Sequence, residues 1–552
     1  MRRLCRVLAM VGSAVLAARP APAGVELDGS LGAAGVLAGP DFRIDAGLGH
    51  QVGGNLFHSF RIFDLVAGER ATFSGPASVA RIIGRVTGGR ASGIDGAIRS
   101  AIPGADLYLV NPAGLVFGPN AVLDVSGSFV AGTADRVLLG DGGRFEARDP
   151  AASVLTAAPV AAFGFLADRP AAITLSGTVL AVPEGRRLHF AGGDLAVEGA
   201  VLFAPGGAVE LEAAGDVTLD AGTISASGSE PGRIAIRAGR LAVRDSEVFA
   251  VTFGPGSGGS LAVSATESVV LDGGYAGVGT PGGGPGGTIS VQAPEVALVN
   301  GAQLDASSFG SGPAGRVTVE AGRSVSLSGA RSTGQPFRSA LFAVGNGGRG
   351  GAVSVRAPRI VLRDGARIDA GSYGPADGGE VVVEAGSLSL ESGGRLFAGA
   401  EGRGAGGLVR VKADSVAIAG NDAASAAPGF ERSGLYATSG YFTGGLTGDG
   451  GRIAVEARSV TVSDGGRINA DSLSGGRAGG VSLAVGTLSL SDGGQVSASN
   501  FGFGTARGGD VHVAATEGVA ITGFEADDPA HFRSGLFNDA IGGADAGAIT
   551  VV

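Results

Sequence analysis

The feature that most constrains the fold is an internal repeat of about 28 residues, found from about residue 230 to residue 552. Residues 350–372 read GGAVSVRAPRIVLRDGARIDAGS and residues 378–400 read GGEVVVEAGSLSLESGGRLFAGA, with seven apolar positions in register. A unit this short cannot bury its apolar face alone, so neighbouring units must stack on one another. The first apolar position of the unit recurs at Ile234, Leu261, Ile289, Val317, Val353, Val381, Val409, Ile453, Val481, Val511 and Ile549.

The spacing of apolar residues within a unit predicts strands. Apolar residues fall at every second position in three short runs separated by turns, and no helical period competes with this pattern. Asn-Gly or Asp-Gly stands before the third run at 300–301, 364–365, 464–465 and 492–493. Three short strands and three corners describe one triangular coil, so we predict an all-β chain folded as a parallel β-helix. A propeller blade needs four strands and ~40 residues, and a sandwich would not repeat one register so often.

Three units are longer than the rest, near residues 322–350, 421–449 and 523–545, and they share a sequence word. It reads PFRSALF at 336–342, FERSGLY at 430–436 and HFRSGLF at 531–537, which suggests a larger repeat of roughly three plain coils and one elaborated coil. Insertions in a solenoid map to loops on one face, often the binding face. The alternative is that each aromatic pair folds back over its own coil as a satellite core. The candidate surface-binding residues are Phe337, Arg338, Phe342, Phe430, Arg432, Tyr436, Phe532, Arg533 and Phe537.

Residues 1–23 have the pattern of an export signal. Three arginines lie within residues 2–6, an apolar run follows over 7–18, and residues 21–23 read APA, the small-x-small pattern that signal peptidase cuts. We therefore predict that the Sec machinery exports the chain and that the mature protein begins at Gly24, secreted or at the cell surface after crossing the periplasm. The net charge of −10 argues against nucleic acid as a partner.

The region from 24 to about 225 is less regular and must contain an N-terminal cap, because an exposed first coil would pair with other chains. It contains GGNLFHSFRIFDLVAGERATFSG (53–75), ARIIGRVTGG (80–89), ADLYLVNPAGLVFGPNAVLDVSGSFVAGTAD (105–135) and APVAAFGFL (158–166). These words, in this order, closely resemble the N-terminal secretion domain of filamentous-haemagglutinin-type exoproteins of Gram-negative bacteria. The resemblance covers about residues 24–225, and residues 226–552 match only as a type of architecture.

The resemblance implies a right-handed β-helix with an N-terminal cap, exported by two-partner secretion. The partner it implies is an outer-membrane transporter that recognises the secretion domain through its periplasmic POTRA domains. Many relatives are adhesins or haemagglutinins, which implies binding to a host-cell or polysaccharide surface. The family word NPNG stands here as NPAG, so the resemblance assigns transporter recognition or a secretion motif to Asn111, Pro112, Ala113, Gly114, Asn55 and Phe57. The residues themselves indicate a tight turn, with Pro112 presetting φ and Gly114 supplying a positive φ.

Catalysis is the main alternative, because parallel β-helices also carry polysaccharide lyases and hydrolases. Asp305 and Asp369 fall at outward positions of third strands, but two coils separate them, which is a poor distance for an acid–base pair. The five histidines form no spaced pair and suggest no metal site, and we predict no cofactor. The charged outward residues are expected to be a solvated face. The favoured prediction is therefore a non-enzymatic exoprotein, with a carbohydrate-active β-helix enzyme exported by the same route as the second.

Overall fold

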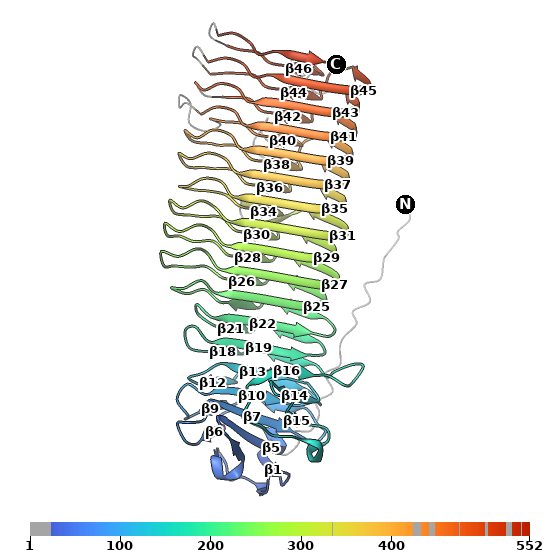
Figure 1. The fold of residues 1–552 in the computed structure, drawn as a ribbon. Helices are drawn as coiled ribbons and strands as arrows, with labels where there is room; N and C mark the ends of the chain where they lie inside the picture. The colour runs from blue at the N-terminus through green and yellow to red at the C-terminus, as the bar shows by residue number, and fades with distance from the viewer. Residues whose placement is uncertain are drawn as a thin grey trace, which may run out of the picture.

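The computed structural model describes residues 24–333, 335–422, 432–440, 448–473, 475–502, 506–525, 533–541 and 544–552. The predicted export signal at 1–23, together with Phe430 and Phe532, lies outside these residues. The described chain is a rod of stacked β-coils with a more irregular N-terminal end (Figure 1). Within the described part, the helical elements are two short 3-10 turns, η1 (Ala46–Leu48) and η2 (Pro150–Ala152). None of the described helices is long and apolar enough to cross a membrane.

The first coil is covered by antiparallel strands, as the need for a cap predicts. Strand β1 pairs antiparallel with β2 and β5, and β4 pairs antiparallel with β5. From β5 onward the rod is built from parallel pairs, beginning with β5 to β7 and β7 to β10. The strands of this end are β1 (Gly24–Asp28), β2 (Ala34–Val36), β3 (Asp41–Asp45), β4 (His50–Val52), β5 (Asn55–Asp64), β6 (Arg70–Ser74), β7 (Arg81–Val86), β8 (Ser92–Ile94), β9 (Ala97–Ser100), β10 (Asp106–Val110), β11 (Leu115–Phe117), β12 (Val122–Asp124) and β13 (Phe129–Gly132).

An excursion then leaves the rod and forms a small antiparallel sheet in the order β15-β14-β16. Its strands are β14 (Arg136–Leu139), β15 (Arg144–Glu146) and β16 (Val160–Gly164). We call it the outer sheet. The coils resume with β17 (Ile173–Ser176), β18 (Val179–Ala181), β19 (Arg187–Gly192), β20 (Leu195–Glu198), β21 (Val201–Phe203), β22 (Ala208–Ala213), β23 (Val217–Asp220) and β24 (Thr223–Ser225).

From residue 233 each coil has one long strand and one short strand. The long strands are β25 (Arg233–Arg244), β27 (Ser260–Asp272), β29 (Thr288–Val299), β31 (Arg316–Ser328), β35 (Ala352–Leu362), β37 (Glu380–Glu391), β39 (Leu408–Ala419), β41 (Arg452–Ser463), β43 (Gly480–Leu490) and β45 (Val511–Ile521), followed by β47 (Ile549–Val551). The short strands, which form the third sheet together with β18, β21 and β24, are β26 (Glu247–Phe249), β28 (Tyr275–Gly277), β30 (Gln303–Asp305), β34 (Ala340–Phe342), β36 (Arg367–Asp369), β38 (Arg395–Phe397), β40 (Gly434–Tyr436), β42 (Arg467–Asn469), β44 (Gln495–Ser497) and β46 (Gly535–Phe537).

The predicted register is confirmed. The marker residues from Ile234 to Ile549 pair with one another from coil to coil along the whole series. All of them except Ile549 are buried. The predicted Asn-Gly and Asp-Gly corners are also present, and both residues of each have a positive φ, as at Asn300 (54°) and Gly301 (82°). The rod is therefore a parallel β-helix whose core is a set of Val, Ile and Leu columns.

One detail of the coil differs from the prediction. The first and second predicted strands are one continuous strand that bends at its middle, as in β29, where the pairing with β31 shifts between Ala293 and Glu295. A β-bulge can turn a strand without a loop, so the ladder continues through this corner. The turn expected there is absent from these coils.

The insertions form a wall along one side of the rod. The first is an antiparallel hairpin of β32 (Ala330–Thr333) and β33 (Gln335–Arg338), and single antiparallel bridges stand at the same place in the other two. Arg338 contacts the carboxylate of Asp422 in the second insertion. In the same way, Arg432 of the second insertion lies 2.9 Å from the carboxylate of Glu525 in the third. We call these three linked insertions the insertion wall.

The larger repeat has two plain coils for each elaborated one, not three. The short strands of the elaborated coils are β34, β40 and β46, and only two short strands lie between successive members in the third sheet. The contacts in the wall form at the turn of the next plain coil, where each arginine meets a carboxylate of the following insertion. Arg338 donates a hydrogen bond to the carbonyl of Asp364 (3.1 Å), and Arg432 donates one to the carbonyl of Gly465 (3.3 Å).

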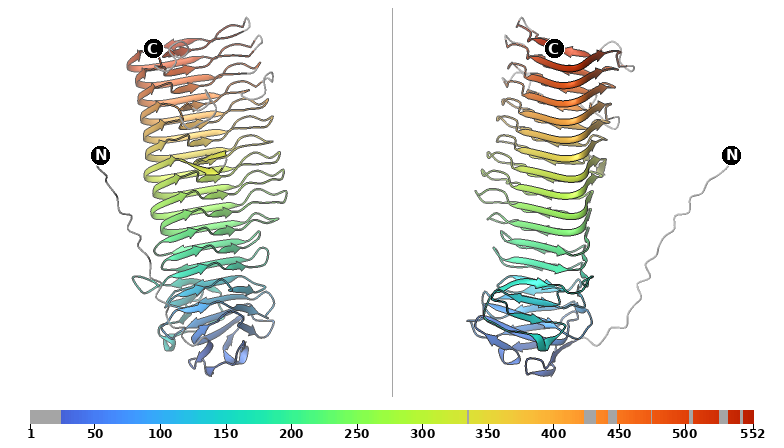
Figure 2. Two further views of the ribbon diagram at one scale, coloured as in Figure 1. Left: turned by 180° about the vertical axis from the view of Figure 1, so that it is seen from behind. Right: turned by 45° about the vertical axis from the view of Figure 1, so that its right-hand side comes forward.

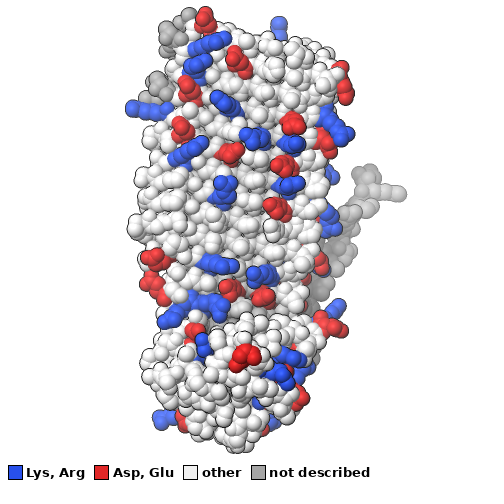
Figure 3. All heavy atoms as spheres, in the orientation of Figure 1, with Lys and Arg blue, Asp and Glu red and all other residues white. Residues whose placement is uncertain are grey.

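The expectation of a solvated charged face holds for the long strands but not for the third sheet. Lys, Arg, Asp and Glu side chains of both signs are interspersed on the face shown in Figure 3. Asp305 and Asp369, in contrast, are buried, although they do lie two coils apart. Asp369 accepts hydrogen bonds from the N–H of Gly371 (2.8 Å) and the hydroxyl of Tyr373 (3.1 Å), which replace the water it would otherwise bind.

Candidate functional site

The turn at 111–114 follows β10, and its first residue is fully buried. The Asn111 side chain donates hydrogen bonds to the carbonyl of Arg90 (2.9 Å) and to the hydroxyl of Ser92 (3.0 Å). Its carbonyl oxygen accepts one from the N–H of Ala113 (2.9 Å). Each polar atom of this side chain therefore has a partner inside the fold, and the side chain fixes the corner between β10 and β11.

The rest of the turn has the geometry that its residue types predict. Gly114 has a φ of +120°, and its N–H donates to the carbonyl of Asn111 (3.0 Å). A side chain there would lie 3.3 Å from the carbonyl oxygen of Ala172. Pro112 and Ala113 are half-buried, so they are the part of the turn that solvent reaches.

Asn55 and Phe57 lie on β5 and are also fully buried. The Asn55 side chain donates hydrogen bonds to the carbonyls of Thr156 (2.9 Å) and Ala158 (2.7 Å), in the segment that leads into β16. The ring of Phe57 packs edge-to-face on Phe145 of β15, with ring centroids 5.1 Å apart. Both residues thus connect the rod to the outer sheet.

The outer sheet covers a second apolar cluster on the outside of the first coils. Outward side chains of β5, β7, β10 and β13 meet inward side chains of the outer sheet. These strands are therefore apolar on both faces, which explains the run of buried residues along β5. The cluster consists of Phe57, Ile83, Tyr108, Val110, Val130, Ala134, Val137, Leu139 and Phe145.

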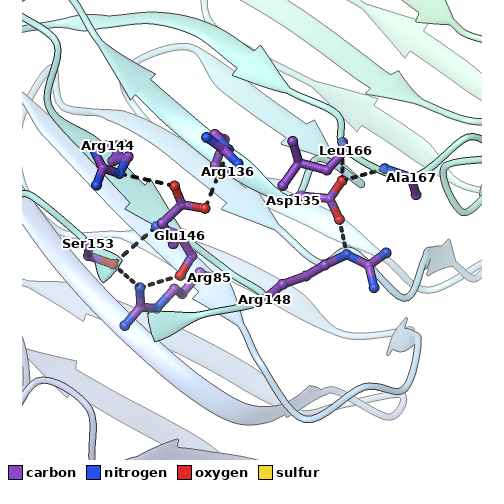
Figure 4. Close-up of polar contacts among 9 residues, drawn as sticks. All are labelled: Arg85, Asp135, Arg136, Arg144, Glu146, Arg148, Ser153, Leu166 and Ala167. Carbon is purple, nitrogen blue, oxygen red and sulfur yellow. Dashed lines mark hydrogen bonds and ion pairs between the residues drawn. The ribbon is translucent and has the colours of Figure 1, made fainter. Parts of the chain in front are cut away.

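A buried arginine joins the cap, the rod and the outer sheet, and Figure 4 shows its contacts with the outer sheet. Arg85 of β7 donates hydrogen bonds to the hydroxyls of Ser59 on β5 (2.7 Å) and Ser30 of the cap (2.8 Å). It also donates to the hydroxyl of Ser153 (2.7 Å) and to the carbonyl of Glu146 on β15. One side chain therefore contacts three parts of the domain that are far apart in the sequence.

The surroundings of Arg85 preserve its charge despite burial. Its guanidinium lies 4.0 Å from the centre of the Phe145 ring, a cation–π contact. Burial lowers its pKa to about 10, while Asp28 and Glu146 act in the opposite direction. The group is therefore still protonated near neutral pH.

Two buried carboxylates complete the network at the outer sheet (Figure 4). Glu146 lies 3.4 Å from the guanidinium of Arg136 and 3.3 Å from that of Arg144. Asp135, at the point where the chain leaves the rod for β14, contacts Arg148. Its burial opposes ionisation, but hydrogen bonds from Arg148 and from backbone N–H groups outweigh it and lower its pKa. The outer sheet is thus fixed to the rod by charge-assisted contacts as well as by apolar packing.

The outer sheet also exposes apolar surface. Leu166, just after β16, is 60% exposed and Val154 is 46% exposed. The local sequence around Asp135 and Glu146 does not distinguish these carboxylates from solvated ones. Only for Arg85 does the sequence indicate burial, because it lies in a predicted strand among apolar residues.

The structure separates the predicted surface-binding residues into two groups. The insertion wall holds Arg338 and Arg432 through their ion pairs. Phe342 is buried on the third sheet. The hydroxyl of Tyr436 donates a hydrogen bond to the carbonyl of Arg432 (2.9 Å). Phe337 is 54% exposed, while Arg533 is exposed and Phe537 half-buried. The sequence did not indicate Phe524, which is 53% exposed on the third insertion.

The described residues contain no group of three or more His, Cys, Asp or Glu side chains placed to hold a metal ion. The networks described above instead stabilise a folded surface at the N-terminal end of the rod.

Comparison with known proteins identifies this end of the chain. The family model for the TPS (two-partner secretion) secretion domain matches residues 23–242. Among solved structures, the HMW1 secretion domain from Haemophilus influenzae is similar at 16% sequence identity, covering 80% of this chain and 94% of that chain, with a TM-score of 0.35. No curated protein matches. Residues 23–242 therefore form a TPS secretion domain, the export domain of two-partner secretion.

Proposed function

We propose that the rod acts outside the cell as a non-enzymatic adhesin of the haemagglutinin type, after export by the Sec machinery and removal of residues 1–23 by signal peptidase. The observation that carries this proposal is the insertion wall, which presents related loops along one side of the rod. Phe337 and Phe524 extend from it with more than half of their surface exposed, and Arg533, which pairs with Phe524, is also exposed. Exposed aromatic residues and arginine are typical of interaction surfaces.

Attachment of the purified, secreted chain to cells tests the adhesin proposal. Alanine at Phe337, Phe524 and Arg533 together should reduce attachment at least fivefold, because the exposed contacts of the wall are lost. The matched control is Val270→Ala, which removes an exposed apolar side chain from a long strand. Equal attachment of both variants and the parent would contradict a role for the wall.

We further propose that the transporter recognises the outer sheet of the secretion domain, through Leu166, Val154 and the edge of β16. Asn111, Asn55 and Phe57 support this surface from inside, and Pro112 and Ala113 are the part of the turn that can touch the transporter directly. The support is that the three buried side chains have their polar and apolar contacts within the domain. Leu166→Asp should therefore block secretion without unfolding the domain, whereas Val116→Asp, on an exposed strand of the rod, should not.

A carbohydrate-active enzyme exported by the same route is the second candidate, and one observation favours it. Glu401 follows β38 and lies one coil from Asp369 on β36, so two carboxyl groups stand on neighbouring coils. Burial, with the charge of Asp369, raises the pKa of Glu401 to about 7, in the range of a general acid. Cleavage of an acidic polysaccharide by the parent chain, abolished in Glu401→Gln, would favour the enzyme over the adhesin.

A further inference from the structure

The aromatic residues of the repeat region are confined to one side of the rod. The long strands from β25 to β45 contain no Phe, Tyr or Trp. The described aromatic residues from 226 onward lie on the third sheet, on the corner that follows it, or on the insertions. This side of the rod is turned toward the viewer in the left panel of Figure 2. The core of the repeat region is filled by Val, Ile, Leu and Ala, so packing of that core does not explain why the aromatic residues lie on one side.

Aromatic rings on the third sheet lie close to glycines of the same sheet. The ring of Phe397 lies so close to Gly371 and Gly399 that a Cβ at either position would be 2.7 or 2.5 Å from it. Tyr275 covers Gly277 in the same way, since a Cβ at position 277 would lie 2.7 Å from its ring. Tyr275 and Phe397 are both half-buried, so part of each ring is accessible to a ligand.

A second row of rings stands on the corner that follows the third sheet. Phe253, Phe309 and Tyr373 each come four residues after the end of a short strand and are 65%, 60% and 37% exposed. Two coils separate each from the next, a distance of about 10 Å at ~4.8 Å per coil. An extended chain of 1,4-linked sugars repeats every two rings over a similar length.

The accessible charges on β36 and β38 are positive, whereas Glu247 on β26, near Phe253, is exposed and negative. Arg367 and Arg395 are paired neighbours on β36 and β38, and both are half-buried, with the Arg367 guanidinium 4.7 Å from the centre of the Phe342 ring. Asp305 and Asp369 on the same face are buried. An anion that approaches this face therefore meets the guanidinium groups before the carboxylates.

Glu401 is the acidic group next to these two arginines. It is half-buried, and Asp369, Arg367 and Arg395 act on it from β36 and β38. Because its carboxyl is only partly ionised near neutral pH, the arginines dominate the local charge.

We propose that the outer face of the third sheet binds an extended acidic polysaccharide that lies along the rod axis, with sugar rings on the aromatic faces and carboxylate or sulfate groups on Arg367 and Arg395. This inference rests on the proposed adhesin function and names its ligand. A sugar ring offers a flat face of C–H groups and a rim of polar groups, which match aromatic rings separated by arginines. A folded protein partner would instead require a continuous apolar centre with few charges.

A binding assay tests whether the arginines recognise anionic groups of the polymer. It compares binding of the full secreted chain to immobilised polygalacturonate and chondroitin sulfate with its binding to cellulose, the neutral polymer. The double variant Arg367→Gln and Arg395→Gln should lose at least tenfold in affinity for the acidic polymers. The matched control is Arg356→Gln with Arg410→Gln, which removes the same charge from the long strands. An equal loss in both double variants would show a general charge effect and overturn the proposal.

The exposed rings provide a second variant that does not threaten the fold. Phe253→Ser with Phe309→Ser should reduce binding at least fivefold, while the exposed pair Val116→Ser with Val270→Ser, on strands outside the third sheet, should leave it unchanged. Unchanged binding in the phenylalanine variant would overturn the aromatic contact. If the parent attaches to cells but binds no acidic glycan, this inference fails and the adhesin proposal survives. If it attaches to nothing, the adhesin proposal itself fails.

The pH dependence gives a readout that a structural role would not produce. Protonation of Glu401 removes a negative charge beside the ligand, so affinity for polygalacturonate should rise severalfold from pH 8 to pH 6, where the polymer stays ionised. Glu401→Gln should bind more tightly at pH 8 and lose this dependence. The opposite trend, or the same trend in Glu401→Gln, would contradict the proposed site.

Discussion

At the scale of single residues, the secretion domain contains a buried histidine whose environment makes it an acid-sensitive point. His58 on β5 is fully buried between the rings of Phe60 and Phe73. Burial lowers its pKa from 6.5 to about 4, although Asp45 and the carbonyl of Leu48 act in the opposite direction. The neutral form is therefore the form that the fold accepts.

The sign of the resulting pH dependence follows from the lowered pKa. The unfolded chain binds a proton at His58 before the folded chain does, so the stabilisation is complete above pH 6.5 and is lost as pH falls toward 4. Unfolding in urea should show a loss of about 2 kcal/mol from this group between pH 7.5 and 5. The variant His58→Leu should lack this part of the pH dependence, and His50→Gln, at an exposed position, should retain it.

Arg85 is the second residue whose replacement should be costly. Arg85→Ala leaves the hydroxyls and the carbonyl that it contacts without a donor, and it removes the cation beside Asp28. We expect a loss of roughly 3–5 kcal/mol of stability in the secretion domain. Arg99→Ala breaks an exposed pair with Asp124 and should cost less than about 1 kcal/mol. Similar unfolding midpoints for the two variants would contradict the central role of Arg85.

At the scale of elements, the turn after β10 should tolerate change only where solvent reaches it. Asn111→Ala and Gly114→Ala should leave the protein in the periplasm, because the first loses three buried hydrogen bonds and the second places a side chain at a φ of +120°. Ala113→Asn, at a half-buried position, should be secreted normally. Fractionation of cells that produce the partner transporter measures this, and normal export of Asn111→Ala would show that the turn is dispensable.

The insertion wall should behave as one coupled element. A double-mutant cycle on Arg432 and Glu525, whose side chains are 11% and 15% exposed, should give a coupling energy of about 1–2 kcal/mol. The exposed pair of Arg458 and Asp414, 3.3 Å apart, should give less than about 0.5 kcal/mol. Equal coupling in the two cycles would mean that the wall is only a set of independent loops.

The sequence predicted the repeat well and the contacts between insertions poorly, for physical reasons. Register depends on apolar periodicity and on turn residues, both of which are local, so the column from Ile234 to Ile549 could be read directly. The pair of Arg338 and Asp422 depends on which side chains meet across two intervening coils, and no local pattern records this. For Arg85 the local sequence indicates a strand position among apolar residues but not the partners of its side chain. The right-handed winding of the coils stays a prediction.

At the scale of the whole molecule, the protein is a rod for which we propose that the N-terminal end directs export and the sides act after export. The family match lies in the first part of the chain, and the aromatic and insertion surfaces lie in the repeats. The two roles are therefore placed on separate parts of one continuous β-helix, with the cap and the outer sheet at one end (Figure 1).

The most direct test of this division is the location of the full-length chain in a Gram-negative cell with and without its partner transporter. We predict that the chain accumulates in the medium or on the surface only when the transporter is present, and that removal of residues 24–242 abolishes this export. Equal release in the absence of the transporter, or export of the repeats without the secretion domain, would contradict it.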